Sequence, residues 1–149
     1  EFEHVYQAVR FGASFLDQLA KTDLTVKSLQ DGFVKYISTW YKLDFLYRKC
    51  IYHSRASGQV TLLEDLLTEV RNHYSNSYLL ELNNRWQGML DEHQAWEVPG
   101  QISQREFYDH FVQRQFLNDN YKVAVIISDA LRYEIGAELA DLICQEELS

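Results

Sequence analysis

The sequence has few residues that interrupt helices, with one proline and six glycines among 149 residues. Proline and glycine are the least favourable residues in a helix interior, so their scarcity favours long helices. The two cysteines, Cys50 and Cys144, match neither a disulfide framework nor a zinc-binding spacing. No apolar run approaches the roughly 20 residues of a membrane span. These absences exclude a disulfide-stapled or membrane-spanning protein, and we expect a cytoplasmic protein with reduced thiols.

The charge is unevenly distributed along the chain. The net charge is −8, with 14 Lys and Arg against 22 Asp and Glu. Residues 1–55 carry 8 basic and 6 acidic side chains, a net of +2, and residues 56–149 carry 6 and 16, a net of −10. Because phosphate binding needs a basic face, the whole surface is not a nucleic-acid platform. A weakly basic helical face in residues 1–55 stays open, beside an ordinary solvated surface.

Apolar residues at helical spacing predict a helical domain over residues 1–98. Its helices are expected at 3–20, 26–56, 61–74 and 77–95. Thr25 is the expected N-cap of the second helix, and a polar break is expected at 75–77. Capping boxes are expected at Thr61–Glu64 and Ser103–Glu106. Residues 99–121 are then a connecting helix and linker. The chain lacks an initiator Met and begins inside a helical pattern, which predicts a piece excised from a longer protein.

One charged residue lies on the apolar stripe of the second helix. This is Asp44, and Arg48 follows it four residues later. A carboxylate placed four residues before a basic side chain is the favoured order for a pair on one helix face. The sequence predicts a structural ion pair that fixes helix register, or alternatively a pair that faces a partner or substrate.

The apolar period changes in the last part of the chain. Residues 123–127 form a short, β-branched apolar run, which predicts an interior parallel strand. Asp129 follows it, and an amphipathic helix is predicted over 132–147. The fold class is therefore mainly α: a helical bundle followed by the first strand, turn and helix of an incomplete α/β domain, residues 122–149.

Asp129 is the strongest candidate for chemistry. A carboxylate just past the carboxyl end of a buried parallel strand lies where α/β sheets bind ligands. It could ligate a metal, act as a base or cap the following helix. Arg132 could reach an anionic substrate or another domain, and Glu134 could complement the helix dipole. The five histidines show no metal-binding spacing, and the chain has no glycine-rich phosphate loop.

Two segments resemble a known family. Residues 122–134, with the string I-S-D-A-L-R-Y-E, are similar to the opening of the PglZ domain of bacterial BREX phage-resistance systems, in the alkaline phosphatase superfamily. Residues 44–49 resemble the D-x-x-Y-R-K element of the helical region before that domain. The resemblance implies a phosphatase- or phosphodiesterase-like hydrolase that uses divalent metals, with zinc expected, and it implies that Asp129 is a metal ligand. Arg132 and Glu134 match the motif as candidates for contacts behind the metal or with substrate.

The rest of the family's catalytic set is not found in this sequence. The superfamily needs a downstream Ser or Thr nucleophile and further Asp and His ligands, and a single carboxylate cannot hold a catalytic metal. We therefore expect this chain alone to bind no metal and to be inactive. A lone parallel strand leaves its backbone groups unpaired, so residues 122–149 are expected to self-associate, swap, fray or refold.

Two alternatives use the helical region differently. In one, it docks other BREX subunits or DNA, with Lys35, Lys42 and Lys49 as the basic side chains. In the other, the chain is a structural helical bundle and its resemblance to the family is accidental.

Overall fold

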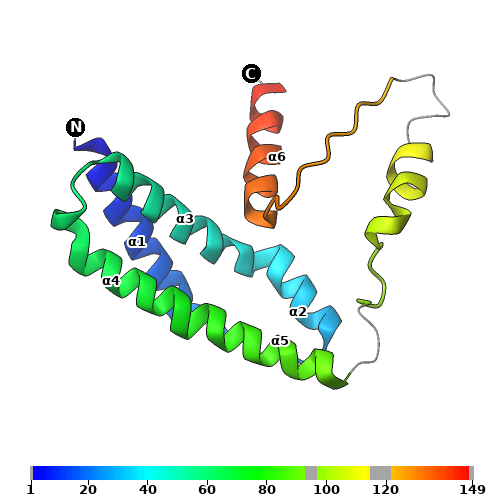
Figure 1. Cartoon of the computed structure of the whole chain (residues 1–149), viewed down its shortest axis with the longest axis horizontal. Helices are drawn as coiled ribbons and strands as arrows, with labels where there is room; N and C mark the ends of the chain where they lie inside the picture. The colour runs from blue at the N-terminus through cyan, green and yellow to red at the C-terminus, as the bar shows by residue number, and fades with distance from the viewer. Residues whose placement is uncertain (1, 93–96, 115–121, 148–149) are drawn as a thin grey trace.

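The computed structural model describes residues 2–92, 97–114 and 122–147, and it is mainly helical as predicted. Three long helical segments build a bundle (Figure 1). The first segment is α1 (Glu3–Lys21). The second is bent and consists of α2 (Leu29–Lys35), a π-helical turn (Tyr36–Trp40) and α3 (Tyr41–Ala56). The third consists of a 3-10 turn (Thr61–Leu63), α4 (Glu64–Asn72), a π-helical turn (His73–Leu79) and α5 (Leu80–Glu92). Beyond the bundle lie two short turns, Gln104–Glu106 and Tyr108–Gln113, and α6 (Tyr133–Glu147).

The bundle has a simple antiparallel path. Figure 1 shows α1 and α3 running side by side in opposite directions, with α4 and α5 returning beneath them. α4 packs on α1, and α2 packs on α5. α6 stands outside the bundle and packs on α3. The last helix of the chain is thus held by the second helical segment, although about 80 residues separate them in sequence.

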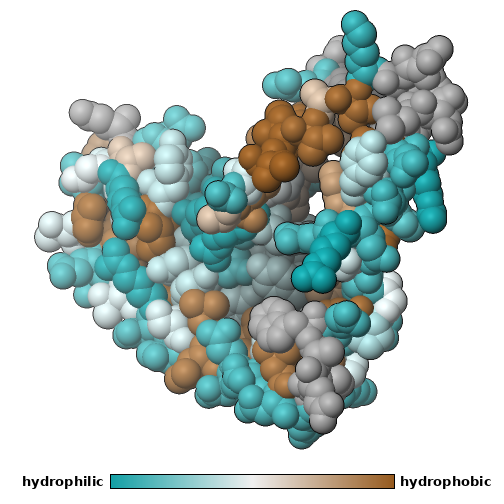
Figure 2. All heavy atoms as spheres, turned by 45° about the vertical axis from the view of Figure 1, so that its right-hand side comes forward, coloured by the Kyte–Doolittle hydropathy of each residue, from teal (hydrophilic) through white to brown (hydrophobic). Residues whose placement is uncertain are grey.

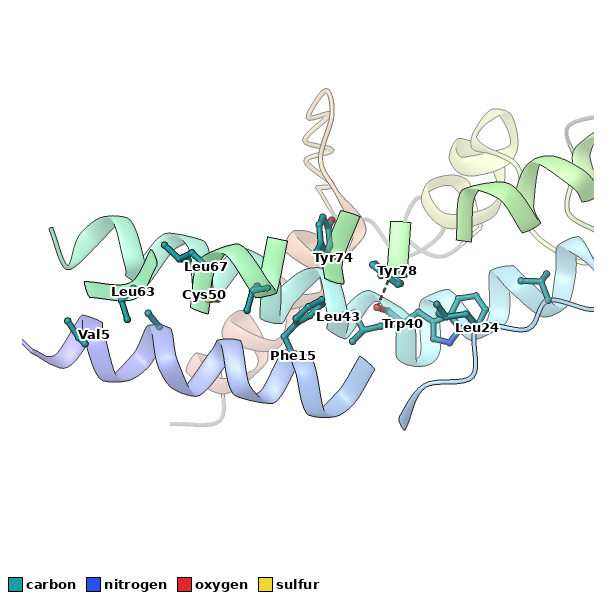
Figure 3. Close-up of a cluster of buried hydrophobic side chains, with 13 residues drawn as sticks. Val5, Phe15, Leu24, Trp40, Leu43, Cys50, Leu63, Leu67, Tyr74 and Tyr78 are labelled. Carbon is teal, nitrogen blue, oxygen red and sulfur yellow. Dashed lines mark hydrogen bonds between the residues drawn. The ribbon is translucent and has the colours of Figure 1, made fainter. Parts of the chain in front are cut away.

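The core lies between α1, α3 and the long third segment (Figure 3). Phe15, Leu43 and Tyr78 are fully buried within it. Burying a large apolar side chain stabilises a fold by about 1.5–3 kcal/mol, so this cluster holds the bundle together. Gly12 allows the close approach, because a Cβ there would lie 3.2 Å from both Cys50 Sγ and a Leu66 methyl.

The second and third segments correct three local predictions. The cap of α2 is Ser28, whose side chain accepts from the Asp31 amide, whereas Thr25 is held by Asp23 in a turn. Thr61 lies inside a 3-10 turn and makes no capping box. The expected break at residues 75–77 is a π-helical turn that continues the helix. Burial of Tyr74 and Tyr78 on either side of that polar stretch outweighs its weak helix preference.

One capping prediction is confirmed beyond the bundle. Ser103 and Glu106 form the expected capping box. The Val98–Gln101 turn closes with a 3.1 Å backbone hydrogen bond, and Gly100 takes a positive φ of 77°. The predicted end of a helix at 95 and the part of the predicted linker over 115–121 lie outside the described residues.

The predicted strand is unpaired in the described structure. Residues 122–128 are extended, but they join no β-ladder within the part of the chain that the structure describes. Ile126 and Ile127 are 92% and 89% exposed, where an interior strand would bury them. Figure 2 shows apolar side chains gathered on this side of the molecule. The backbone N–H and C=O groups of a strand need hydrogen-bond partners on neighbouring strands, and residues 122–128 have no such strand among the described residues.

The predicted final helix is present as α6. Among the described residues, no helix combines the length and the apolar character needed to cross a membrane.

Candidate functional site

Asp129 lies in the turn between the extended segment and α6. The turn also contains Ala130, whose φ of 58° is a left-handed conformation that is unfavourable for a residue with a Cβ. α6 begins at Tyr133, and the Arg132 carbonyl accepts from the Ile135 and Gly136 amides. Arg132 therefore occupies the N-cap position, and the capping role considered for Asp129 is wrong.

The surroundings of Asp129 are largely apolar. It lines a hollow together with Phe107, Phe111 and the exposed residues 125–131. The hollow brings residues of the predicted linker next to the Asp129 turn. Its wall is unlike the bundle core, because these aromatic and aliphatic side chains remain substantially exposed.

The implied metal does not fit the residues present around Asp129. Within the described ranges, no three His, Cys, Asp or Glu side chains gather closely enough to hold a metal ion. One carboxylate offers two oxygens, whereas a catalytic zinc takes three protein ligands and a water. The other ligands would have to come from outside the described residues, so no catalytic step is assigned here. The role of Asp129 as a ligand stays a prediction.

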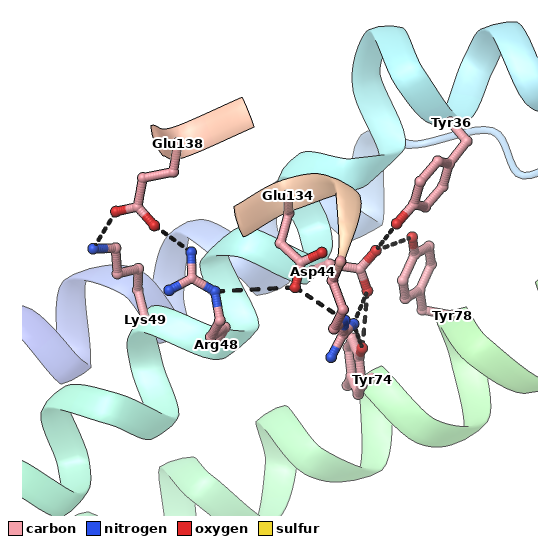
Figure 4. A network of polar contacts seen from close by, with 9 residues as sticks. Tyr36, Asp44, Arg48, Lys49, Tyr74, Tyr78, Glu134 and Glu138 are labelled. Carbon is pink, nitrogen blue, oxygen red and sulfur yellow. Dashed lines mark hydrogen bonds and ion pairs between the residues drawn. The ribbon is translucent and has the colours of Figure 1, made fainter. Parts of the chain in front are cut away.

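The best-formed polar site lies instead around Asp44 (Figure 4). Asp44 is 3% exposed, and its carboxylate accepts hydrogen bonds from three tyrosines. Tyr74 donates to Oδ1 at 2.8 Å, while Tyr36 and Tyr78 donate to Oδ2 at 2.9 and 3.2 Å. Such hydrogen bonds compensate the loss of water around a buried charge. The carboxylate is thus held by neutral donors from the second and third helical segments.

The positive charge near this carboxylate comes from the start of α6. Arg132 Nη2 lies 3.5 Å from Asp44 Oδ1 and donates to the Tyr74 hydroxyl at 3.2 Å. Tyr74 therefore accepts from the arginine and donates to the aspartate, which links the two parts of the chain. The hydrogen bond with Tyr74 raises the pKa of Arg132 further above its ordinary value. The guanidinium remains charged at every pH of interest.

Arg48 and Lys49 face α6 one turn further along α3. Both side chains pair with Glu138, Lys49 at 2.5 Å and Arg48 through a short hydrogen bond. Burial tends to raise the pKa of Glu138, but hydrogen bonds from Lys49 and Arg48 outweigh it and lower that pKa. The predicted pair of Asp44 with Arg48 is therefore not the arrangement in the structure, since each residue has a different partner.

Glu134 is the most enclosed charged residue of the site, with an exposed fraction of 0%. Its Oε1 lies 3.1 Å from Arg132 Nε and 4.0 Å from Arg48 Nε. Neither of its carboxylate oxygens accepts a hydrogen bond from a described residue. The attraction is ionic. Glu134 lies between Arg48 of the bundle and Arg132, the N-cap residue of its own helix.

The tyrosines around Asp44 respond to the buried charge. Burial raises the pKa of Tyr74 to about 12, with the Arg132 hydrogen bond opposing the rise and the Asp44 charge adding to it. Burial, followed by the charge of Asp44, also raises the pKa of Tyr36 and of Tyr78. All three phenols stay neutral donors over the ordinary pH range. A tyrosinate beside the carboxylate would place two negative charges together, which is unfavourable.

Sequence reasoning found Asp44, Arg132 and Glu134 but missed most of their partners. It gave neither the tyrosines nor Glu138 a part in the site. The available signal was the charged residue on an apolar stripe, because a buried carboxylate requires donors. The identity of those donors depends on contacts between distant segments, which spacing within one helix does not reveal.

Comparison with known proteins agrees with this two-part organisation. Residues 107–149 match the family described as the BREX system PglZ alkaline phosphatase-like domain. The chain is 33% identical to "Alkaline phosphatase-like protein PglZ" of Bacillus cereus (strain H3081.97) over 96% of this chain and 17% of that protein. It is also 33% identical to "Alkaline phosphatase-like protein BrxZ" of Escherichia coli O9:H4 (strain HS), over 99% of this chain and 18% of that protein. No solved structure matches.

The described fold and these matches show the class of protein: a helical bundle followed by a segment that matches an alkaline phosphatase-like domain. The chain belongs to the PglZ-type proteins of BREX phage-resistance systems. It spans less than a fifth of the length of the curated relatives it matches.

Proposed function

We propose that this chain is part of a metal-dependent phosphatase- or phosphodiesterase-like protein of phage defence, and that Asp129 is one of its metal ligands. The observation that supports this is the match of residues 107–149 to an alkaline phosphatase-like domain, which includes the Asp129 turn. Residues 1–98 serve as the helical domain, residues 99–121 as the connection, and residues 122–149 as the start of the catalytic domain. The metal, expected to be zinc, would need donors beyond the described residues.

The extended segment supports the same proposal. Residues 123–127 are apolar, and they have no strand neighbours in the described structure. In the intact protein, further strands of the catalytic domain would cover Ile126 and Ile127 and place Asp129 at the edge of a sheet. The chain by itself is then inactive, and its exposed segment is a site of self-association.

The test is divalent-metal-dependent hydrolysis of a phosphodiester reporter by the intact parent protein. Asp129→Ala is expected to abolish it, whereas Asp141→Ala, a matched change at an exposed position of α6, leaves it near the parental rate. Retention of full activity in Asp129→Ala would remove Asp129 from the metal site. An inactive parent with every divalent metal tried would overturn the hydrolase proposal.

A docking function for other BREX subunits is the second candidate, and a surface observation favours it. Phe107, Tyr108 and Phe111 expose aromatic side chains beside the extended segment. The basic face considered for DNA is reduced, because Lys35 pairs with Asp31 and Lys49 pairs with Glu138. We therefore place protein partners ahead of DNA. Co-purification of tagged parent with BREX subunits, compared with a Phe107→Ser and Phe111→Ser double variant, tests this role.

A further inference from the structure

The element Asp44–Lys49 on α3 makes a concentrated set of contacts with the beginning of α6. Asp44 meets Arg132, Arg48 meets Glu134 and Glu138, and Lys49 meets Glu138. The remaining residue of the D-x-x-Y-R-K pattern is Tyr47. Its ring stacks on that of Tyr74, with centroids 3.7 Å apart and planes 1° apart. Every charged side chain of this short element thus contacts α6 or its N-cap residue, Arg132.

The charges of the two surfaces are complementary in order. Along α3 the signs run negative at Asp44, then positive at Arg48 and Lys49. Along the facing segment they run positive at Arg132, then negative at Glu134 and Glu138. Sliding α6 by one turn would set like charges opposite each other, and juxtaposed like charges are unfavourable. The pattern therefore specifies one register for α6 on α3.

The hydrogen-bond donors around Asp44 are positioned by the bundle itself. Tyr36, Tyr74 and Tyr78 belong to the bundle, and all three donate to Asp44. Their positions depend on the bundle core, to which Tyr74 and Tyr78 belong. Arg132 thus contacts groups that the bundle already holds in place. Its side chain is 53% exposed, so it gives up little of its hydration when it makes these contacts.

A further contact ties the start of α6 to the bundle. The Tyr133 hydroxyl donates to the Ile37 carbonyl at 3.2 Å, and its ring lies edge-on to Tyr41. The Ile37 carbonyl lies in the π-helical turn between α2 and α3. Arg132, the N-cap residue, and Tyr133, the first residue of α6, are therefore tied to the bundle, three and four positions after Asp129.

We propose that Asp44–Lys49 and the three tyrosines form a docking platform that fixes the orientation of the Asp129 turn through Arg132. Arg132 is then a positioning residue, and the helical domain is a support on which the first turn of the catalytic domain is held. The positioning part rests on the proposed hydrolase function. The docking part concerns this chain alone and is tested separately.

Hydrogen exchange of this 149-residue chain tests the docking part. Arg132→Gln and Asp44→Asn are each expected to speed exchange of the two α6 amides that donate to the Arg132 carbonyl, those of Ile135 and Gly136. The expected change is about tenfold or more, which corresponds to 1.4 kcal/mol. The double variant should exchange no faster than the faster single variant, because both changes break one linkage. Arg85→Gln is the matched control, since it breaks the exposed Arg85–Glu81 pair.

Unchanged exchange in Arg132→Gln would overturn the platform. That variant alters a half-exposed side chain, so the test holds even if Asp44→Asn does not fold. Multiplicative effects in the double variant would equally contradict a shared linkage.

Activity of the intact parent tests the positioning part. Arg132→Gln should lower kcat about tenfold or more with little change in KM, and Arg132→Lys should recover part of the loss because it keeps the charge. If Asp129→Ala abolishes activity while Arg132→Gln retains the parental kcat, the positioning role is wrong and the hydrolase proposal stands. If the parent shows no metal-dependent hydrolysis, the hydrolase and positioning roles both fall, and the exchange result alone decides the platform.

Discussion

The bundle and the segment after it are held by different forces. The bundle buries a continuous apolar cluster that includes Phe15, Leu43 and Tyr78. α6 leaves Leu139, Leu142 and Ile143 about half exposed, and it is attached to α3 through ion pairs and hydrogen bonds. The burial of side chains that do not ionise is independent of pH, whereas partly exposed ion pairs respond to both pH and salt. The comparison shows a stable support carrying a segment whose attachment can be loosened separately.

The largest expected effect comes from the bundle core. Phe15→Ala should destabilise the bundle by about 3–5 kcal/mol, because it removes a fully buried aromatic ring. Phe107→Ala, an equal truncation at a partly exposed site beyond the bundle, should change the free energy of unfolding by less than about 0.5 kcal/mol. Urea unfolding followed by far-UV circular dichroism measures both. Equal effects would contradict the division between core and attached segment.

The next effect tests the buried carboxylate that joins the two parts. Asp44→Asn should destabilise the bundle by about 1.5–3 kcal/mol, since three tyrosine donors lose a charged acceptor. Tyr133→Phe removes one hydrogen bond to the Ile37 carbonyl at an exposed position and should cost about 1 kcal/mol or less. The same unfolding measurement compares them. A stabilised Asp44→Asn protein would mean that the tyrosines do not compensate the burial of the charge.

High pH should weaken the bundle through its tyrosines. Tyr74 has a pKa raised from 10.0 to about 12, so the folded state keeps its proton where the unfolded chain releases it. Stability from this group is complete below pH 10 and is lost as the pH rises toward 12. Thermal unfolding between pH 9 and 12 should show a falling Tm, and the fall should be smaller in Tyr74→Phe. A flat profile in the parent chain would contradict the prediction.

The smallest effect concerns the attachment of α6 at low pH. The pKa of Glu138 is lowered from its ordinary 4.5, so its contribution is present above that value and is lost as the pH falls through the folded pKa. Exchange of α6 amides should therefore accelerate in acid relative to the bundle, and Glu138→Gln should already show the loosened state at pH 7. Asp141→Asn, at an exposed position of the same helix, is the comparison variant. Loosening that is equal in both variants would argue against a specific role of Glu138.

The sequence predicted the parts of the molecule that depend on local pattern. Apolar spacing gave the helices of the bundle and α6, and the Ser103–Glu106 box is present as expected. The errors fall where distant contacts decide the outcome. Residues 75–77 continue a helix because Tyr74 and Tyr78 are buried. Residues 123–127, predicted as a strand, pair with no other segment among the described residues.

The candidate site divides in the same way. Asp129 was singled out from its place after an apolar run, and its role as a ligand stays a prediction. Asp44 was noticed as a charge on an apolar stripe, but a neighbour four residues away was taken as its partner. Its actual partners come from the long third segment and from the start of α6. Local spacing thus identified the unusual residue and could not supply the contacts that explain it.

The left-handed backbone of Ala130 bears on how the Asp129 turn could vary. Glycine would adopt this conformation without a steric penalty, but it would also give the unfolded chain more freedom. Alanine restricts that freedom and is held in an unfavourable conformation by its surroundings. A β-branched residue would be excluded there, because its crowding at positive φ is greater. The turn beside the predicted ligand therefore disfavours β-branched side chains, and exchange between alanine and glycine would adjust its stiffness without altering its chemistry.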